Sequence, residues 1–165
     1  MASVQGIVPC LWFDGQAEEA ARFYVGVFGG DSGVDEVTRF TEAGQEVHGR
    51  PPGSVLTVEF RLAGQRFTAL NGGPQFRFTE AISLQALCDD QAETDRLWDA
   101  LCAGGEPSQC GWLKDRYGLS WQVVPVRLNA LLFDPDPARA ARVMTALLQM
   151  TKLDLAALER AHAGG

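Results

Sequence analysis

The sequence LWFDGQAEEAARFYVGVFGG, residues 11–30, decides the fold, because a related version returns 75 residues later as ALCDDQAETDRLWDALCAGG, residues 86–105. Six of the twenty aligned positions are identical, and Phe23 aligns with the aromatic Trp98. A second similarity relates two later segments at a constant spacing of 54 residues. It aligns Gly64 with Gly118, Phe67 with Trp121 and Thr68 with Gln122. An internal repeat of this kind predicts two copies of one structural module.

Each copy begins with an apolar segment typical of a β-strand, first Ile7–Phe13 and then Ile82–Cys88. A helical spacing of apolar residues follows in both copies, and a pair of glycines ends each predicted helix. In the second copy, Asp90 and Glu93 have the spacing of a capping box. The repeated unit therefore starts with a strand and a helix.

Further strands are expected after each helix. In the first copy these are Val34–Phe40 and a hairpin formed by Val55–Leu62 and Arg66–Asn71, after a polar loop. The second copy has a turn at 104–107 and a hairpin formed by Gln109–Asp115 and Leu119–Val124. The order is strand, helix and then two or three antiparallel strands, twice, which predicts an α+β fold.

The repeat also sets the predicted domain boundaries. The first module covers residues 1–79, the second covers residues 80–125, and residues 126–165 form a C-terminal helical extension. In that extension Asp136 is placed to cap a helix that has Pro137 at its first position. A second, shorter helix is expected from Leu155 onward.

Composition excludes several classes of protein. Of the 165 residues, 46% are hydrophobic and 21% charged, as expected for a globular protein. The net charge of −7 and the absence of a basic cluster argue against nucleic acid as a partner. We find no apolar segment of membrane-spanning length and no secretion signal, so we expect a cytoplasmic protein without a membrane partner.

Several segments resemble one known family along nearly the whole chain. They are Pro9–Phe13, Ala17–Ala20, Phe23–Tyr24, Val58–Phe60, Ala69–Pro74, Phe76–Thr79, Gln109–Pro125, Arg142–Met144 and Met150–Asp154. In these segments the chain resembles the PhnB-like branch of the vicinal oxygen chelate superfamily, which has the glyoxalase and bleomycin-resistance fold. This branch carries the label 3-demethylubiquinone-9 3-methyltransferase. The resemblance implies paired βαβββ modules, a ligand cup between curved sheets and a homodimer.

Metal-dependent members of the superfamily hold a divalent ion with His, Glu or Gln side chains on the first and last strands of each module. The repeat places Val8, Thr68, Ser83 and Gln122 at these positions. Valine cannot coordinate a metal, neutral hydroxyls are poor ligands, and Gln122 alone cannot hold an ion. We therefore predict no metal site of this kind and no cofactor, with a divalent metal as the alternative. His48, in the polar loop, is a candidate lone ligand or base, and a solvated loop histidine is the simpler interpretation.

The methyltransferase label can be compared with the glycines of the chain. S-adenosylmethionine is usually bound at a glycine-rich turn that follows the first parallel strand of a doubly wound sheet. The glycines of residues 29–33 follow a predicted helix instead, and strands and helices do not alternate along the chain. The sequence therefore gives little support to methyl transfer.

What remains is a cavity with a few polar groups, the usual form of a small-molecule site. Because side chains alternate along a strand, polar side chains that need hydrogen-bond partners lie together on one face of it. The tryptophans could line the walls of the cavity or pack in the core. The candidate ligand-binding residues are Trp12, Thr68, Asn71, Ser83, Gln85, Trp112 and Gln122. We interpret Lys114 and Asp115 as an exposed turn pair rather than an acid and a base.

Two hypotheses follow. In the first, the protein binds or sequesters a small organic molecule without chemistry. In the second, it is an enzyme of the superfamily, either a metal-dependent lyase, isomerase or dioxygenase or the methyltransferase of the family label. The sequence does not decide whether a reaction is catalysed, and no catalytic residue is assigned.

Overall fold

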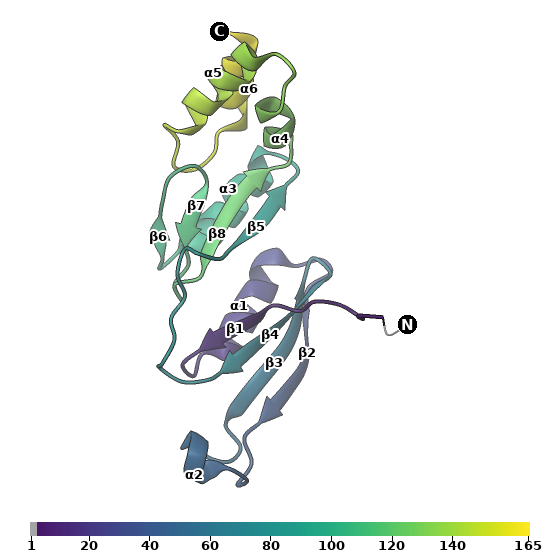
Figure 1. The fold of residues 1–165 in the computed structure, drawn as a ribbon, viewed down its shortest axis with the longest axis vertical. Helices are drawn as coiled ribbons and strands as arrows, with labels where there is room; N and C mark the ends of the chain where they lie inside the picture. Colours follow the sequence, from purple (N-terminus) through teal and green to yellow (C-terminus); the bar gives the residue numbers. More distant parts are fainter. Residues whose placement is uncertain (1–2) are drawn as a thin grey trace. The chain divides into compact units, whose positions relative to one another are not determined.

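The computed structural model describes residues 3–165 and divides the chain into two compact units, Met1–Arg77 and Phe78–Gly165. Each unit contains a four-stranded sheet, and the second also carries the C-terminal helices (Figure 1). Among the described residues, no helix is both long enough and apolar enough to cross a membrane. The α+β prediction with two βαβββ modules is confirmed.

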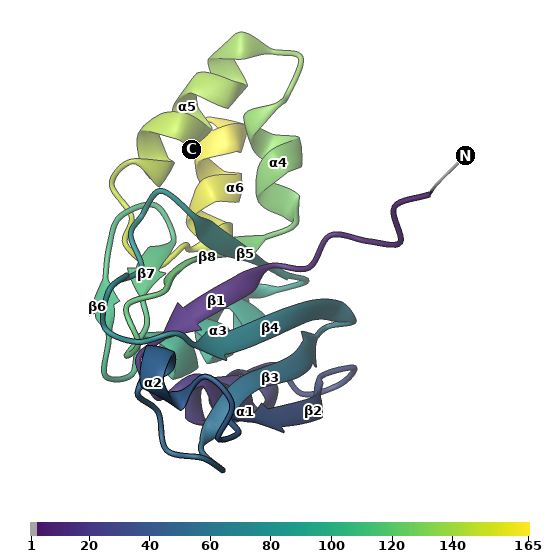
Figure 2. The ribbon, with the colours of Figure 1, turned by 60° about the horizontal axis from the view of Figure 1, so that its bottom comes forward.

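The first unit follows the order strand, helix, three strands. Its elements are β1 (Cys10–Phe13), α1 (Ala17–Phe28), β2 (Gly33–Arg39), the short helix α2 (Gln45–His48), β3 (Val55–Leu62) and β4 (Gln65–Asn71). The sheet has the order β1-β4-β3-β2, with β1 parallel to β4 and the other pairs antiparallel. Helix α1 lies on one face of this sheet (Figures 1 and 2).

Strand alternation explains how this sheet is covered. In β3, Val58, Phe60 and Leu62 are buried on the α1 side, and the residues between them are only partly buried. On α1, the ring of Tyr24 is fully buried and stacks near Phe60, with 6.4 Å between ring centroids. The face away from α1, called the open face below, therefore carries the polar residues.

The second unit repeats the order. Its elements are β5 (Ser83–Cys88), α3 (Gln91–Cys102), β6 (Glu106–Pro107), β7 (Trp112–Lys114), β8 (Ser120–Pro125), α4 (Arg127–Leu132), α5 (Pro137–Leu147) and α6 (Leu155–Ala163). The sheet order, β5-β8-β7-β6, matches that of the first unit. Cys10 pairs with Thr68 in one sheet and Gln85 with Gln122 in the other, so the register follows the spacings of 75 and 54 seen in the sequence.

The ends of the helices agree in most details with the caps predicted from the sequence. The backbone N–H of Glu93 donates to Asp90 Oδ1 at 2.8 Å, as a capping box requires. The returning bond differs, because Glu93 Oε2 accepts from the backbone N–H of Asp89 rather than from that of Asp90. After α3, Gly105 has no room for a side chain, since a Cβ there would lie 2.1 Å from the carbonyl oxygen of Lys114.

Three elements were not predicted, and the three strands β1, β5 and β7 are shorter than expected. Helices α2 and α4 have no side-chain cap, and β6 has only two residues, so each gives a weak sequence signal. Strand β1 begins at Cys10 rather than Ile7. Proline at position 9 cannot donate to a sheet, although its carbonyl accepts from the N–H of Thr68.

The C-terminal helices form a cluster of their own within the second unit. Its buried residues are Leu128, Leu131, Val143, Leu147, Leu153 and Leu158. The predicted cap of α5 is confirmed, because Asp136 Oδ1 accepts from the N–H of Ala138 at 2.9 Å. His162 lies 2.7 Å from Asp134 and so joins the end of α6 to the segment before α5.

Candidate functional site

The open face of the second sheet brings together four of the seven candidate residues. Gln122 of β8 pairs with Gln85 of β5 on one side and with Trp112 of β7 on the other. Cross-strand partners lie on the same face of a sheet, so these three side chains form a row across three strands. Ser83 lies on the same face of β5 as Gln85.

A chain of hydrogen bonds runs through this row. Gln85 Nε2 donates to Gln122 Oε1 at 3.3 Å, and Gln122 Nε2 donates to Ser83 Oγ at 2.8 Å. Within the part of the chain that the structure describes, these are the side-chain bonds of the two amides, and the indole nitrogen of Trp112 has no partner. The row therefore keeps donors and acceptors for another molecule.

The next row on this face contains Lys114 of β7, Ser120 of β8 and Ser83 of β5. Lys114 Nζ lies 2.5 Å from a carboxylate oxygen of Glu80, which belongs to the segment before β5. The hydrogen bond between them raises the pKa of Lys114 and lowers that of Glu80, so both groups stay charged at neutral pH. A cavity of about 140 Å³ lies beside this row.

The interpretation of Lys114 and Asp115 as an exposed turn pair is wrong for Asp115, which is buried. Asp115 Oδ1 accepts from the backbone N–H groups of Tyr117 and Leu119, and its Oδ2 accepts from the indole N–H of Trp121 at 2.8 Å. A buried carboxylate with three such donors holds the turn between β7 and β8. Alternation alone could not find this role, because the residue lies in a turn.

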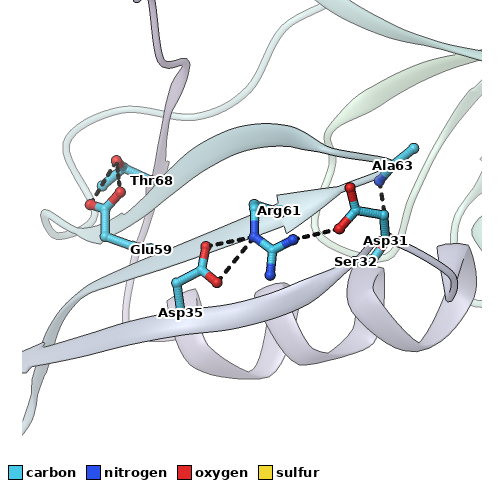
Figure 3. A network of polar contacts seen from close by, with 7 residues as sticks. All are labelled: Asp31, Ser32, Asp35, Glu59, Arg61, Ala63 and Thr68. Carbon is cyan, nitrogen blue, oxygen red and sulfur yellow. Dashed lines mark hydrogen bonds and ion pairs between the residues drawn. The ribbon is translucent and has the colours of Figure 1, made fainter.

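The open face of the first sheet carries a different polar group. Thr68 Oγ1 lies 2.8 and 3.0 Å from the two carboxylate oxygens of Glu59, its cross-strand partner (Figure 3). Cys10 flanks Thr68 on β1. Burial, and then the negative charge of Glu59, raises the pKa of the Cys10 thiol. The thiol is therefore protonated at neutral pH and is a weak nucleophile.

Sequence reasoning missed Glu59 as a candidate. It alternates with the buried Val58 and Phe60, and this alternation was the available signal. Arg61, two residues further along, is already engaged, because its guanidinium contacts both Asp35 and Asp31 (Figure 3). Arg61 therefore does not offset the charge of Glu59.

The environment of Trp12 in the first unit is well defined. Its indole N–H donates to the carbonyl of Gly73 at 2.8 Å, and its ring packs edge-on against Phe76 with 4.9 Å between centroids. A side chain at Gly72 would meet the Trp12 ring at 2.3 Å. Trp12 is half-buried and lies on the same face of β1 as Cys10.

Asn71 lies on the other face, toward α1, and is buried. Its Oδ1 accepts from the backbone N–H of Ala17, the first residue of α1, at 2.9 Å. Its Nδ2 donates to the carbonyl of Val55 at 3.0 Å. These contacts let Asn71 cap a helix that its own N-cap, Gln16, does not cap. Its predicted role in ligand binding stays a prediction.

The residues present fit a divalent metal poorly. The sheet register corrects the expected set of positions, because the strand partner of Thr68 is Cys10 rather than Val8. The strand partner of Gln122 is Gln85 rather than Ser83. A thiol must lose its proton to bind a metal, and the raised pKa of Cys10 opposes this. Among residues 3–165, no three His, Cys, Asp or Glu side chains form a group that could hold an ion. The absence of a metal site remains a prediction.

Neither of the two histidines lies on a strand of either sheet. His48, in α2, accepts from the backbone N–H of Arg50 through Nδ1, and its ring packs 4.6 Å from that of Phe40. The contacts of His48 hold the loop between β2 and β3.

Comparison with known proteins identifies the family. The family model described as 3-demethylubiquinone-9 3-methyltransferase matches residues 5–124. The chain belongs to this family. Its PhnB-like members are part of the vicinal oxygen chelate superfamily, as the resemblance implied. A search of curated proteins gives no match.

Solved structures support this assignment. A PhnB protein from Bacillus cereus, provisionally described as a 3-demethylubiquinone-9 3-methyltransferase, is 32% identical with a TM-score of 0.65, over 74% of this chain and all of that one. Protein PA1353 from Pseudomonas aeruginosa is 24% identical, with a TM-score of 0.58, over 74% of this chain and 98% of its own. The fosfomycin resistance protein FosX from Mesorhizobium loti is 15% identical, with a TM-score of 0.53, over 78% of this chain and 97% of its own. The last two show the fold alone.

The family match ends at residue 124, before α4 begins at Arg127. The C-terminal helical cluster therefore lies outside the residues that the family model matches.

Proposed function

We propose that this PhnB-like protein binds a small organic molecule on the open face of its second sheet. The observation that carries the proposal is the row of Trp112, Gln122 and Gln85, which combines an aromatic surface with amides whose hydrogen-bonding capacity is only partly used. Ligand sites typically combine apolar and aromatic walls with a few polar groups that fix orientation. Here Ser83 completes the polar end of the row.

The chemistry of the row favours binding over reaction. Amides and a serine hydroxyl without a neighbouring base donate and accept hydrogen bonds, but they do not take up protons near neutral pH. The residues at the equivalent strand positions also fit a metal poorly, as argued above. We therefore propose a binding or sequestering role without a bound metal.

A second candidate is an enzyme of the superfamily, and Glu59 favours it. Its carboxylate lies on the open face of the first sheet and accepts a hydrogen bond from Thr68, which fixes its orientation. A fixed carboxylate facing a ligand is one requirement of general acid–base catalysis. The family name would make this reaction a methyl transfer.

We further propose that the protein is a homodimer, as the superfamily resemblance implies. Closed two-fold assemblies are the most common form of soluble oligomers. Native mass spectrometry tests this directly through the mass of the assembly.

The same experiment tests the function. Protein purified without chelator or affinity tag is analysed for metals and then by native mass spectrometry. A metal-free dimer carrying a small organic adduct supports the binding role. About one tightly held metal ion per subunit would overturn the proposal and favour the enzyme.

A further inference from the structure

The cavity beside Lys114 contains a buried hydroxyl without a partner. Ser120 is 1% exposed, lines this cavity of about 140 Å³, and its Oγ has no hydrogen-bond partner among residues 3–165. A buried hydroxyl without a partner costs free energy that a hydrogen bond from another molecule would recover. Ser120 is therefore an attachment point that the chain itself leaves unused.

Ser120 differs in this respect from Ser83, its direct neighbour on β5. The two serines are cross-strand partners on the same face, and Ser83 Oγ accepts from Gln122 Nε2 at 2.8 Å. The same residue type on the same face is thus satisfied at one position and unsatisfied at the next. The lack of a partner is specific to the residue that lines the cavity.

The other walls of the cavity indicate what it accepts. They include the aromatic Trp112 and the apolar Pro107 and Leu113. An engineered apolar cavity of about 150 Å³ holds benzene, so the available space suits a group about the size of one six-membered ring. This is smaller than a typical site for a whole ligand, which takes about 300 Å³ or more. The cavity would therefore hold one end of a larger molecule.

The charges of the cavity favour an uncharged group. Lys114 is paired with Glu80, and the exposed Glu106 lies across from Lys114 in the neighbouring strand. An anion would be repelled by these two carboxylates, and a cation would have to compete with the Lys114 ammonium that is already paired with Glu80. Lys114 can only donate hydrogen bonds and Ser120 can donate one, so an oxygen acceptor satisfies both.

We infer that this cavity holds an uncharged, carbonyl-bearing group of the ligand, whose oxygen accepts a hydrogen bond from Ser120 Oγ. The inference rests on the proposed function, because it names the chemistry of one end of the molecule bound on that open face. It adds Ser120 and Lys114 to the row of Trp112, Gln122 and Gln85.

Three probes with one ring and different charges test the inference: benzamide, benzoate and benzylammonium. Each is titrated into the full-length protein labelled with ¹⁵N, and the indole N–H signal of Trp112 is followed by NMR. We expect benzamide to bind more tightly than the two charged probes. Tighter binding of benzoate or of benzylammonium, or no binding of any probe, would overturn the inference.

The matched variants are Ser120→Ala and Ser83→Ala. Loss of one hydrogen bond should weaken benzamide binding about two- to tenfold in Ser120→Ala. Ser32→Ala, which removes a hydroxyl from the first unit, is the binding control and should leave benzamide binding unchanged. Without a probe, Ser120→Ala should keep or raise the melting temperature, whereas Ser83→Ala should lower it because Gln122 loses its acceptor. An equal fall in both variants would show that Ser120 already has a partner, such as a buried water, and would contradict the inference.

These results separate the two proposals. A native organic adduct together with failure of benzamide would leave the proposed function standing and remove only the assignment of the cavity. A metal-bound protein without an adduct would remove the proposed function itself.

Discussion

Replacing Asn71 tests whether this candidate ligand-binding residue caps α1 instead. In Asn71→Ala, the N–H of Ala17 and the carbonyl of Val55 both lose their side-chain partner. Each hydrogen bond contributes about 1 kcal/mol, and a buried group left without a partner costs about 1–3 kcal/mol. We expect the free energy of unfolding of the first unit to fall by about 2–4 kcal/mol.

The lower end of this range applies if water replaces the amide. Asn71 lines a cavity of about 210 Å³, from which water can reach the exposed groups. The assay is urea denaturation combined with hydrogen exchange of the α1 amides, which reports on the helix that Asn71 caps. Exchange should accelerate most in the first turn of α1.

Thr68→Ala is the matched control, because Thr68 lies three residues earlier in the same strand on the opposite face. Its side chain bonds only to Glu59 among the described residues, so its loss should cost about 1 kcal/mol or less. A cost for Asn71→Ala within about 0.5 kcal/mol of that for Thr68→Ala would refute the capping role and return Asn71 to the candidate ligand residues.

Three further predictions use other parts of the chain. Gly26→Ala, in the last turn of α1 with open space around its Cβ, should stabilise the protein by about 0.5–1 kcal/mol in urea denaturation. Gly105→Ala should destabilise it because the new Cβ meets the Lys114 carbonyl, and equal effects of the two changes would contradict this. Glu59→Gln should lower the pH at which iodoacetamide labels Cys10, measured by peptide mass spectrometry, since Glu59 helps to raise the pKa of that thiol, and an unchanged pH profile would count against it. The pKa of Asp134 lies below its ordinary 3.8, first because the N–H of Asp136 donates to it and then because of the hydrogen bond with His162. The stabilising contribution of Asp134 is therefore present above about pH 4 and is lost as the pH falls through its lower folded-state pKa. The difference in melting temperature between wild type and Asp134→Asn should close at low pH, and a constant difference would argue against this linkage.

The repeat in the sequence predicted the order of strand, helix and antiparallel strands in both modules, because the helix recurs after 75 residues and the final strand after 54. The family resemblance supplied the third strand of each module. The spacings of 75 and 54 correspond to the observed pairs Cys10 with Thr68 and Gln85 with Gln122. Alternation also placed Ser83 and Gln85 on one face of their strand. These are local patterns with a period of two or 3.6 residues, which a sequence displays directly.

The remaining features depend on contacts between distant residues. Asn71 contacts a helix that begins 54 residues earlier, and neither its own strand nor the helix carries a signal for this bond. Asp115 is buried because Trp121 and two backbone N–H groups converge on it, a result of the turn geometry. Strand β6 has only two residues, too few for a periodic pattern.

The most direct test of the central claim compares the wild type with Gln122→Leu by native mass spectrometry after purification without chelator or tag. Leucine keeps approximately the volume of glutamine and removes the amide at the centre of the row formed by Trp112, Gln122 and Gln85. The proposed function predicts an organic adduct on the wild type that is lost or strongly reduced in Gln122→Leu, with both proteins folded. An adduct that is retained equally in both proteins, or a tightly bound metal ion in place of an adduct, would contradict it.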